Sequence, residues 1–250
     1  MKNLPIYDVL DDIKTTLNTE STLILEAPPG AGKSTVVPIS LLNESWLGNK
    51  VIIMLEPRRV AARMVAVQMA KLLGEEVGQS VGYQVKMESC YSKQTKLLVV
   101  TEAILVRKLQ SDQALEDVAM VIFDEFHERS IHTDLSLALC LQVQELLRPD
   151  LKLLIMSATL DSLELTNLLG KIPVINSKGK IYDVENIYLE TNIKQPDSKS
   201  INTLLLNITL KAIKEDEGDI LVFLAGSREI QRLQVLLEES LKGKDIEVLP

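Results

Sequence analysis

The sequence predicts an α/β fold: a mostly parallel β-sheet with helices on both of its faces. Short apolar runs such as 51–55 and 118–123 have no polar alternation, which is typical of central strands covered on both sides. Segments with apolar residues at three- and four-residue steps lie between these runs, as in parallel sheets built from alternating strands and helices. A glycine-rich pattern of the phosphate-binding kind, at 27–35, follows an earlier apolar run at 22–25.

Length and composition suggest more than one domain. The chain has 250 residues with 46% hydrophobic content, which is more than one ordinary α/β domain uses. Pro173, Gly179 and a polar stretch over 191–200 indicate a boundary region. We therefore expect a first domain over 1–178 and the beginning of a second, truncated domain over 179–250.

Charge and residue usage restrict the function. The net charge of −8 means that any binding of nucleic acid must be local, in a basic groove. Cys90 and Cys140 are far apart and predict reduced thiols, and His127 and His132 are too few for the usual zinc site. No signal peptide or membrane-spanning run is visible, so we expect a soluble cytoplasmic protein without membrane or zinc binding. Nothing implies an oligomer.

The first elements surround the glycine-rich run at 27–35. The apolar spacing of 4–17 predicts a helix, 22–25 a strand, and 33 to about 42 a second helix. Strand, glycine-rich turn and helix form the context in which backbone N–H groups cradle phosphates, while a lysine adds charge and a hydroxyl binds Mg²⁺. Ala27 replaces the usual first glycine, and a purely structural loop is the alternative. The predicted phosphate-binding residues are Gly30, Ala31, Gly32, Lys33, Ser34 and Thr35.

Two further strand ends carry polar residues. The strand 51–55 leads to Arg58 and Arg59 and then to a helix that runs to Leu73 and stops at Gly74. Arginine near a helix start opposes the helix dipole, which favours contact with a phosphate backbone over mere solvation. After strands at 81–85 and 96–100, Thr101 could donate to a phosphate, cap the short helix that ends near 109, or do both.

The apolar strand 118–123 ends in Asp124 and Glu125. One carboxylate can hold the Mg²⁺ that bridges nucleotide phosphates, and the next can activate water, although such a pair also caps turns. A helix over 135–147 and a strand over 151–156 lead to Ser157 and Thr159. Beyond Gly170 we expect strands at 184–189, 219–224 and the C-terminal end, with helices over 201–213 and from 230.

With these residues in place, the sequence resembles the N-terminal part of a superfamily 2 helicase of the DEAH-box group, and most closely the bacterial HrpB type. Six runs match the family motifs I, Ia, Ib, II, III and IV in order: APPGAGKS (27–34), LEPRRVAA (55–62), VTEA (100–103), DEFHERS (124–130), MSATL (156–160) and LVFLAG (221–226). Ala27 and Phe126 depart from the general DEAH pattern as the HrpB type does, and Ala103 replaces a common glycine.

The resemblance implies an RecA-like P-loop NTPase domain over 1–178, the helicase ATP-binding domain, and the start of a second RecA-like domain. It implies that Lys33 binds phosphates and that Ser34, Asp124 and Glu125 form the metal site, with Glu125 as general base. His127, Ser157 and Thr159 would couple the nucleotide to domain movement, although His127 could simply be a satisfied hydrogen-bonding histidine. The implied contacts to single-stranded RNA or DNA, with RNA favoured, are Arg58, Arg59, Thr101 and Gly226.

Two absences qualify this expectation. No Q-R-x-G-R-x-G-R run is present, so the motif V and VI arginines are missing and the chain should bind nucleotide but hydrolyse it poorly. No glutamine precedes the phosphate loop, so we expect ATP with Mg²⁺ and also acceptance of other nucleoside triphosphates. Two other classes stay open at this point: a P-loop enzyme with a small-molecule substrate, such as a kinase, and a non-catalytic nucleotide-binding module.

Overall fold

A computed structural model describes residues 4–158, 170–179, 183–189 and 200–250 of the chain. By its internal contacts the chain divides into two compact units, Met1–Tyr182 and Asp183–Pro250. The assignment of two RecA-like domains to 1–178 and 179–250 stays a prediction. Along the described residues, no helix is both long enough and apolar enough to cross a membrane.

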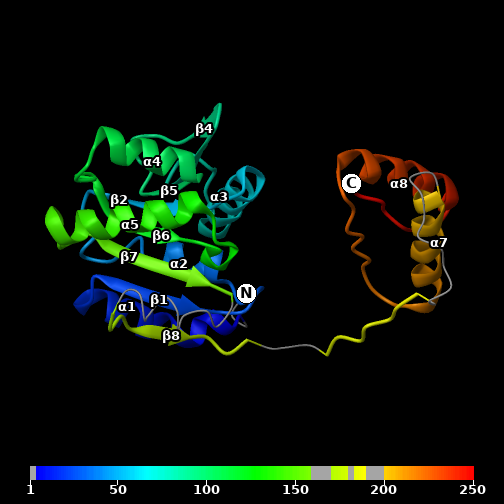
Figure 1. Cartoon of the computed structure of the whole chain (residues 1–250), viewed down its shortest axis with the longest axis horizontal. Coiled ribbons are helices and arrows are strands. Elements are labelled where there is room, and N and C mark those ends of the chain that lie inside the picture. Colours follow the sequence, from blue (N-terminus) through cyan, green and yellow to red (C-terminus); the bar gives the residue numbers. More distant parts are fainter. Residues whose placement is uncertain (1–3, 159–169, 180–182, 190–199) are drawn as a thin grey trace. The chain divides into compact units, whose positions relative to one another are not determined.

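The first unit contains an eight-stranded sheet in the order β4-β3-β5-β2-β6-β7-β1-β8 (Figure 1). Every pair of neighbouring strands is parallel except β3 and β4, which are antiparallel. The predicted α/β fold class is confirmed. The strands are β1 (Thr22–Glu26), β2 (Val51–Leu55), β3 (Val81–Val85), β4 (Glu88–Cys90), β5 (Leu97–Val100), β6 (Val118–Phe123), β7 (Lys152–Ser157) and β8 (Val174–Asn176).

Helices cover both faces of this sheet because its central strands are apolar on both sides. Successive strand side chains point to opposite faces, so Leu23 and Leu25 join one core cluster and Ile24 joins the other. The first cluster packs under α1 (Leu10–Thr19), α2 (Lys33–Ser40) and α3 (Arg59–Leu73). The second packs under α4 (Glu102–Ser111) and α5 (Ile131–Leu146). The result is a three-layer α/β/α unit.

Local sequence signals explain the end of α3 and the start of α5. Helix α3 stops at Gly74, which is left-handed with φ 75°, as the sequence predicts. Helix α5 begins before the predicted start at 135, because Ser130 caps it by accepting the Thr133 N–H at 3.0 Å. The helix predicted over 4–17 begins instead as a 3₁₀ helix, η1 (Pro5–Val9), which continues into α1.

The second unit departs from the prediction. Its helices are α7 (Ser200–Glu215) and α8 (Ser227–Ser240), which pack together through Leu233, Leu237 and Leu241. The predicted strands at 184–189, 219–224 and the C-terminal end are wrong, since the described residues there form no strand. A strand needs a neighbour to complete its backbone hydrogen bonds, and no segment that the structure describes is paired with these residues. Leu221 and Phe223 are accordingly exposed.

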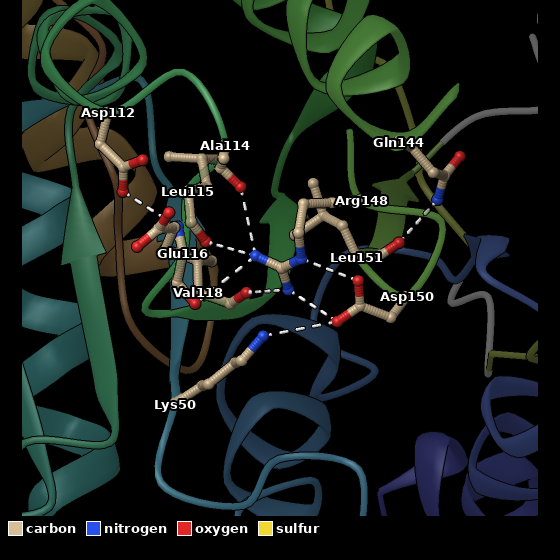
Figure 2. A network of polar contacts seen from close by, with 10 residues as sticks. All are labelled: Lys50, Asp112, Ala114, Leu115, Glu116, Val118, Gln144, Arg148, Asp150 and Leu151. Atoms are coloured by element: carbon tan, nitrogen blue, oxygen red, sulfur yellow. Dashed lines mark hydrogen bonds and ion pairs between the residues drawn. The ribbon is translucent and has the colours of Figure 1, made fainter. Parts of the chain in front are cut away.

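Arg148 lies at the amino-terminal ends of the strands and links several segments there (Figure 2). Its guanidinium donates to the carbonyl oxygens of Leu115 at 2.7 Å and Val118 at 3.1 Å, and binds both carboxylate oxygens of Asp150 at 2.7 and 2.8 Å. Lys50, which precedes β2, reaches the same carboxylate at 3.4 Å. The side chains of Arg148, Asp150 and Lys50 therefore connect the segments from which the strands begin. Those predicted site residues of the first unit that the structure describes lie at the opposite ends of the strands, their carboxyl-terminal ends.

Candidate nucleotide site and nucleic-acid interface

The phosphate-loop segment connects β1 to α2 at the carboxyl-terminal edge of the sheet. Gly30 and Gly32 have φ of 77° and 96°, in the left-handed region that glycine adopts without strain. A Cβ on Gly32 would also lie 3.0 Å from Leu4 Cδ1 and 3.1 Å from Ile6 Cγ2. The Ile6 N–H donates to the Ala31 carbonyl at 3.2 Å, so η1 braces the loop. The eight-residue helix α2 begins at Lys33 and directs its amino end into the loop.

Lys33 is almost completely buried and forms an ion pair with Glu125. The Lys33 Nζ lies 3.2 Å from Glu125 Oε1, across the gap between the ends of β1 and β6. A buried ammonium is stable only with such a partner, because burial removes its hydration. The pair brings together the phosphate-binding lysine and the general base that the sequence predicts.

Asp124 is buried at the end of β6, and its surroundings suit a metal ligand. Its Oδ1 accepts the Glu125 N–H at 2.9 Å, whereas Oδ2 is buried with no hydrogen-bond partner among the described residues. Burial raises the pKa of Asp124 to about 6, and the negative charge of Glu125 raises it further. The Ser34 hydroxyl and the positive charge of Lys33 act in the opposite direction and lower the pKa. A carboxylate oxygen without a donor, beside a hydroxyl, can accept a cation at little extra desolvation cost.

Glu125 has a left-handed backbone, with φ 48° and ψ 38°. This is uncommon for a residue with a side chain and is typical of functional sites where the surrounding fold imposes strain. The 3₁₀ helix η2 (Phe126–Glu128) follows at once, and Phe126 anchors it by packing edge-on against Phe123 at 6.3 Å between ring centroids. The fold thus holds the Glu125 carboxylate beside the phosphate loop.

His127 connects this turn to the end of β7. Its Nδ1 lies 3.4 Å from Glu125 Oε2 and accepts the Ala158 N–H at 3.3 Å. A ring nitrogen that accepts from Ala158 cannot donate to Glu125 at the same time. His127 therefore makes the ordinary hydrogen bond that a satisfied histidine makes, and this bond joins the segment after β6 to the segment after β7.

Ser157 is the last residue of β7 and is paired in register with Glu26, directly before the phosphate loop. The Ala27 N–H donates to the Ser157 carbonyl at 3.0 Å, which ties the loop to this strand end. The structure therefore places Ser157 with the nucleotide-site residues. Thr159 lies outside the described residues.

Three predicted nucleic-acid contacts lie at the ends of β2 and β5 in the same sheet edge. Arg58 precedes α3 and is exposed, with its Nη2 2.5 Å from Glu128 Oε1. Arg59 Nη2 donates to the Lys86 carbonyl at 3.0 Å. Thr101 is buried at the start of α4, but its side chain makes no capping hydrogen bond, so the capping alternative is not supported. Gly226, the fourth, precedes α8 in the second unit.

Sequence reasoning missed two acidic residues beside the site, Glu56 and Glu128. Burial raises the pKa of Glu56 to about 7, and the nearby charge of Asp124 adds to the effect. The backbone N–H of Arg58 opposes it from 3.4 Å. Glu56 directly follows β2, so its position at a strand end was a usable signal, and Glu128 lies within the motif II run 124–130.

Comparison with known proteins identifies the family of this chain. Residues 11–168 match the family model described as DEAD/DEAH box helicase. The chain is 44% identical over 250 residues to the ATP-dependent RNA helicase HrpB of Escherichia coli (strain K12), spanning all of this chain and 30% of the relative.

Two crystal structures of Escherichia coli HrpB share the fold. The structure titled DEAH/RHA helicase HrpB matches with a TM-score of 0.87 and 45% identity over 95% of this chain. The structure titled DExH-box NTPase HrpB matches with a TM-score of 0.78 and 44% identity over 97%. The chain covers 30% of each of those proteins. The family match over 11–168, more than half of the chain, shows that this chain belongs to the DEAD/DEAH box helicase family.

Proposed function

We propose that the whole protein is an ATP-dependent helicase or translocase that moves along single-stranded nucleic acid, with RNA favoured over DNA. The observation that carries the proposal is the conjunction, at one sheet edge, of the ion pair between buried Lys33 and partly exposed Glu125 with the exposed Arg58. The preference for RNA rests on the name of the relative that is 44% identical. A net charge of −8 means that strand binding must be local rather than spread over the surface.

Within the nucleotide site, backbone N–H groups of 30–35 would hold the phosphates and Lys33 would neutralise their charge. Ser34 through its hydroxyl and Asp124 through Oδ2, the carboxylate oxygen that has no donor among the described residues, would hold a Mg²⁺ ion. When bound there it would supply charge neutralisation to the phosphates. No group of three or more His, Cys, Asp or Glu in the described part of the chain is placed to hold a metal.

Glu125 would act as the general base. Binding of a phosphate to Lys33 would separate the Lys33–Glu125 pair, now at 3.2 Å, and leave the carboxylate able to orient water. His127 and Ser157 would transmit the change, since His127 already joins the segment after β6 to Ala158. Thr159 is proposed for the same role from its sequence position. The strand contacts would be Arg58, Arg59, Thr101 and Gly226.

The 250 residues should hydrolyse ATP slowly by themselves. Their sequence has no Q-R-x-G-R-x-G-R run, and loss of an arginine finger costs about 10³ to 10⁵ in rate in related NTPases. We also propose a cytoplasmic location, which the free thiols of Cys90 and Cys140 support.

Glu125→Gln in the whole protein tests the proposal. We expect strand-stimulated ATPase to fall by about 10² to 10⁴, the usual contribution of a general base, while binding of a fluorescent ATP analogue persists. Glu145→Gln, a charge-matched change on α5 away from the site, is the control. Rates should be measured with single-stranded RNA and with DNA. An unchanged stimulated rate in Glu125→Gln would show that the mechanism is wrong.

A further inference from the structure

Glu128 is the last residue of η2, and its carboxylate holds the guanidinium of Arg58. The Oε1–Nη2 distance is 2.5 Å, and the two side chains are 33% and 70% exposed. The pair spans 70 residues of sequence and joins the segments that follow β2 and β6, which are neighbours in the sheet. Arg58, which the sequence predicts to bind a nucleic-acid strand, therefore already has an anionic partner in η2, the turn that follows Glu125.

Glu128 and a nucleic-acid phosphate would use the same group of Arg58. The guanidinium fork binds carboxylate and phosphate oxygens through the same donors, and Arg58 stands at a helix start, where the dipole makes an anionic partner favourable. Arg59 differs, since its Nη2 donates to the uncharged Lys86 carbonyl at 3.0 Å. Of the two arginines, only Arg58 is held by an acid among the described residues.

The same short turn connects Glu128 to Glu125. The Glu128 N–H donates to the Glu125 carbonyl at 2.9 Å, so the two residues close one hydrogen-bonded turn. Glu125 has its left-handed φ of 48° at the start of that turn, and Phe126 is buried within it. Phe126 is 5% exposed and anchors the middle of the turn, so the Glu128 side chain and the Glu125 backbone belong to one short, constrained segment.

We propose that Glu128 is a positioning residue that competes with the strand for Arg58, so that a bound phosphate releases Glu128 and lets η2 bring Glu125 into its active orientation. This inference rests on the proposed function. It assigns to one ion pair the link between strand binding and hydrolysis in the first unit. An exposed ion pair of this kind contributes modestly, so its removal should change strand affinity about two- to fivefold.

The test is a double-mutant cycle in the whole protein. Glu128→Gln should tighten binding of a fluorescein-labelled single-stranded oligouridylate about two- to fivefold, measured by anisotropy at low salt. Asp134→Asn is the matched control, because it removes the same charge from the nearby exposed pair with Arg129. In an Arg58→Gln background, Glu128→Gln should no longer change the affinity. Equal tightening in both backgrounds, or none in either, would overturn the competition.

The proposed effect of Glu128 on Glu125 is measured separately, by ATPase rates. Glu128→Gln should lower the ratio of strand-stimulated to unstimulated ATPase. It should also lower the oligouridylate concentration at which stimulation is half-maximal. A residue that only supports the fold would lower the melting temperature without changing that concentration. An unchanged ratio would refute the link to Glu125. If the unmutated protein neither binds the oligonucleotide nor is stimulated by it, the proposed function fails together with this inference. If it binds and is stimulated, but the effects of Glu128→Gln and Arg58→Gln on affinity are independent, only the inference is refuted.

Discussion

Replacing Arg148 by alanine should destabilise the first unit by about 2–4 kcal/mol. Its guanidinium donates to two carbonyl oxygens of buried residues, Leu115 and Val118, and bonds from a charged donor contribute about 1.5–3 kcal/mol each. The sum of about 3–6 kcal/mol is reduced because the Leu115 carbonyl also accepts the Val118 N–H at 2.9 Å. Urea denaturation at pH 7 measures the loss as a lower midpoint with an unchanged slope.

The exposed partner of Arg148 provides a contrast. Asp150→Asn removes the ion pair but leaves the guanidinium on its carbonyls, and Asp150 is 63% exposed. Its pKa is lowered chiefly by its hydrogen bonds to Arg148, but solvent screens such a pair, so we expect a loss below about 1 kcal/mol. If Arg148→Ala cost no more than Asp150→Asn, the buried carbonyls would not be the source of the stability.

Three further predictions concern the site. Glu56 binds its proton more tightly in the folded chain, so its stabilising effect is complete below about pH 4.5 and is lost as the pH rises to about 7. Glu56→Gln should therefore gain up to about 3 kcal/mol relative to the unmutated protein at pH 8 but little at pH 4.5, in urea titrations without Mg²⁺; equal effects at both pH values would contradict this. Gly32→Ala forces a side chain into a φ of 96° beside Leu4 and Ile6, so it should cost about 1–3 kcal/mol and weaken ATP-analogue binding, and a stable variant with full affinity would refute the loop geometry. GTP and UTP should displace labelled ATP with similar affinity because no glutamine precedes the phosphate loop, and strict adenine preference would disprove this.

The apolar runs of the first unit were sufficient to predict its central strands. A strand covered on both faces is apolar throughout, and this local property survives in the sequence whatever its neighbours are. The edge strands β4 and β8 were not predicted, because Glu88–Cys90 and Val174–Asn176 are too short to carry a pattern. In the second unit the same kind of run misled, since 219–224 is apolar but has no paired neighbour in the described residues.

Sequence by itself determined which chemical groups stand at strand ends: Lys33 and Ser34 after β1, Asp124 and Glu125 after β6, Arg58 and Arg59 after β2. It could do so because motif and strand are adjacent in the chain. Only the tertiary structure decided which of them meet. The pairs Lys33–Glu125 and Arg58–Glu128 depend on strand order and on one left-handed turn, which bring together residues distant in sequence. The same arrangement leaves Asp124 Oδ2 buried without a hydrogen-bond partner among the described residues.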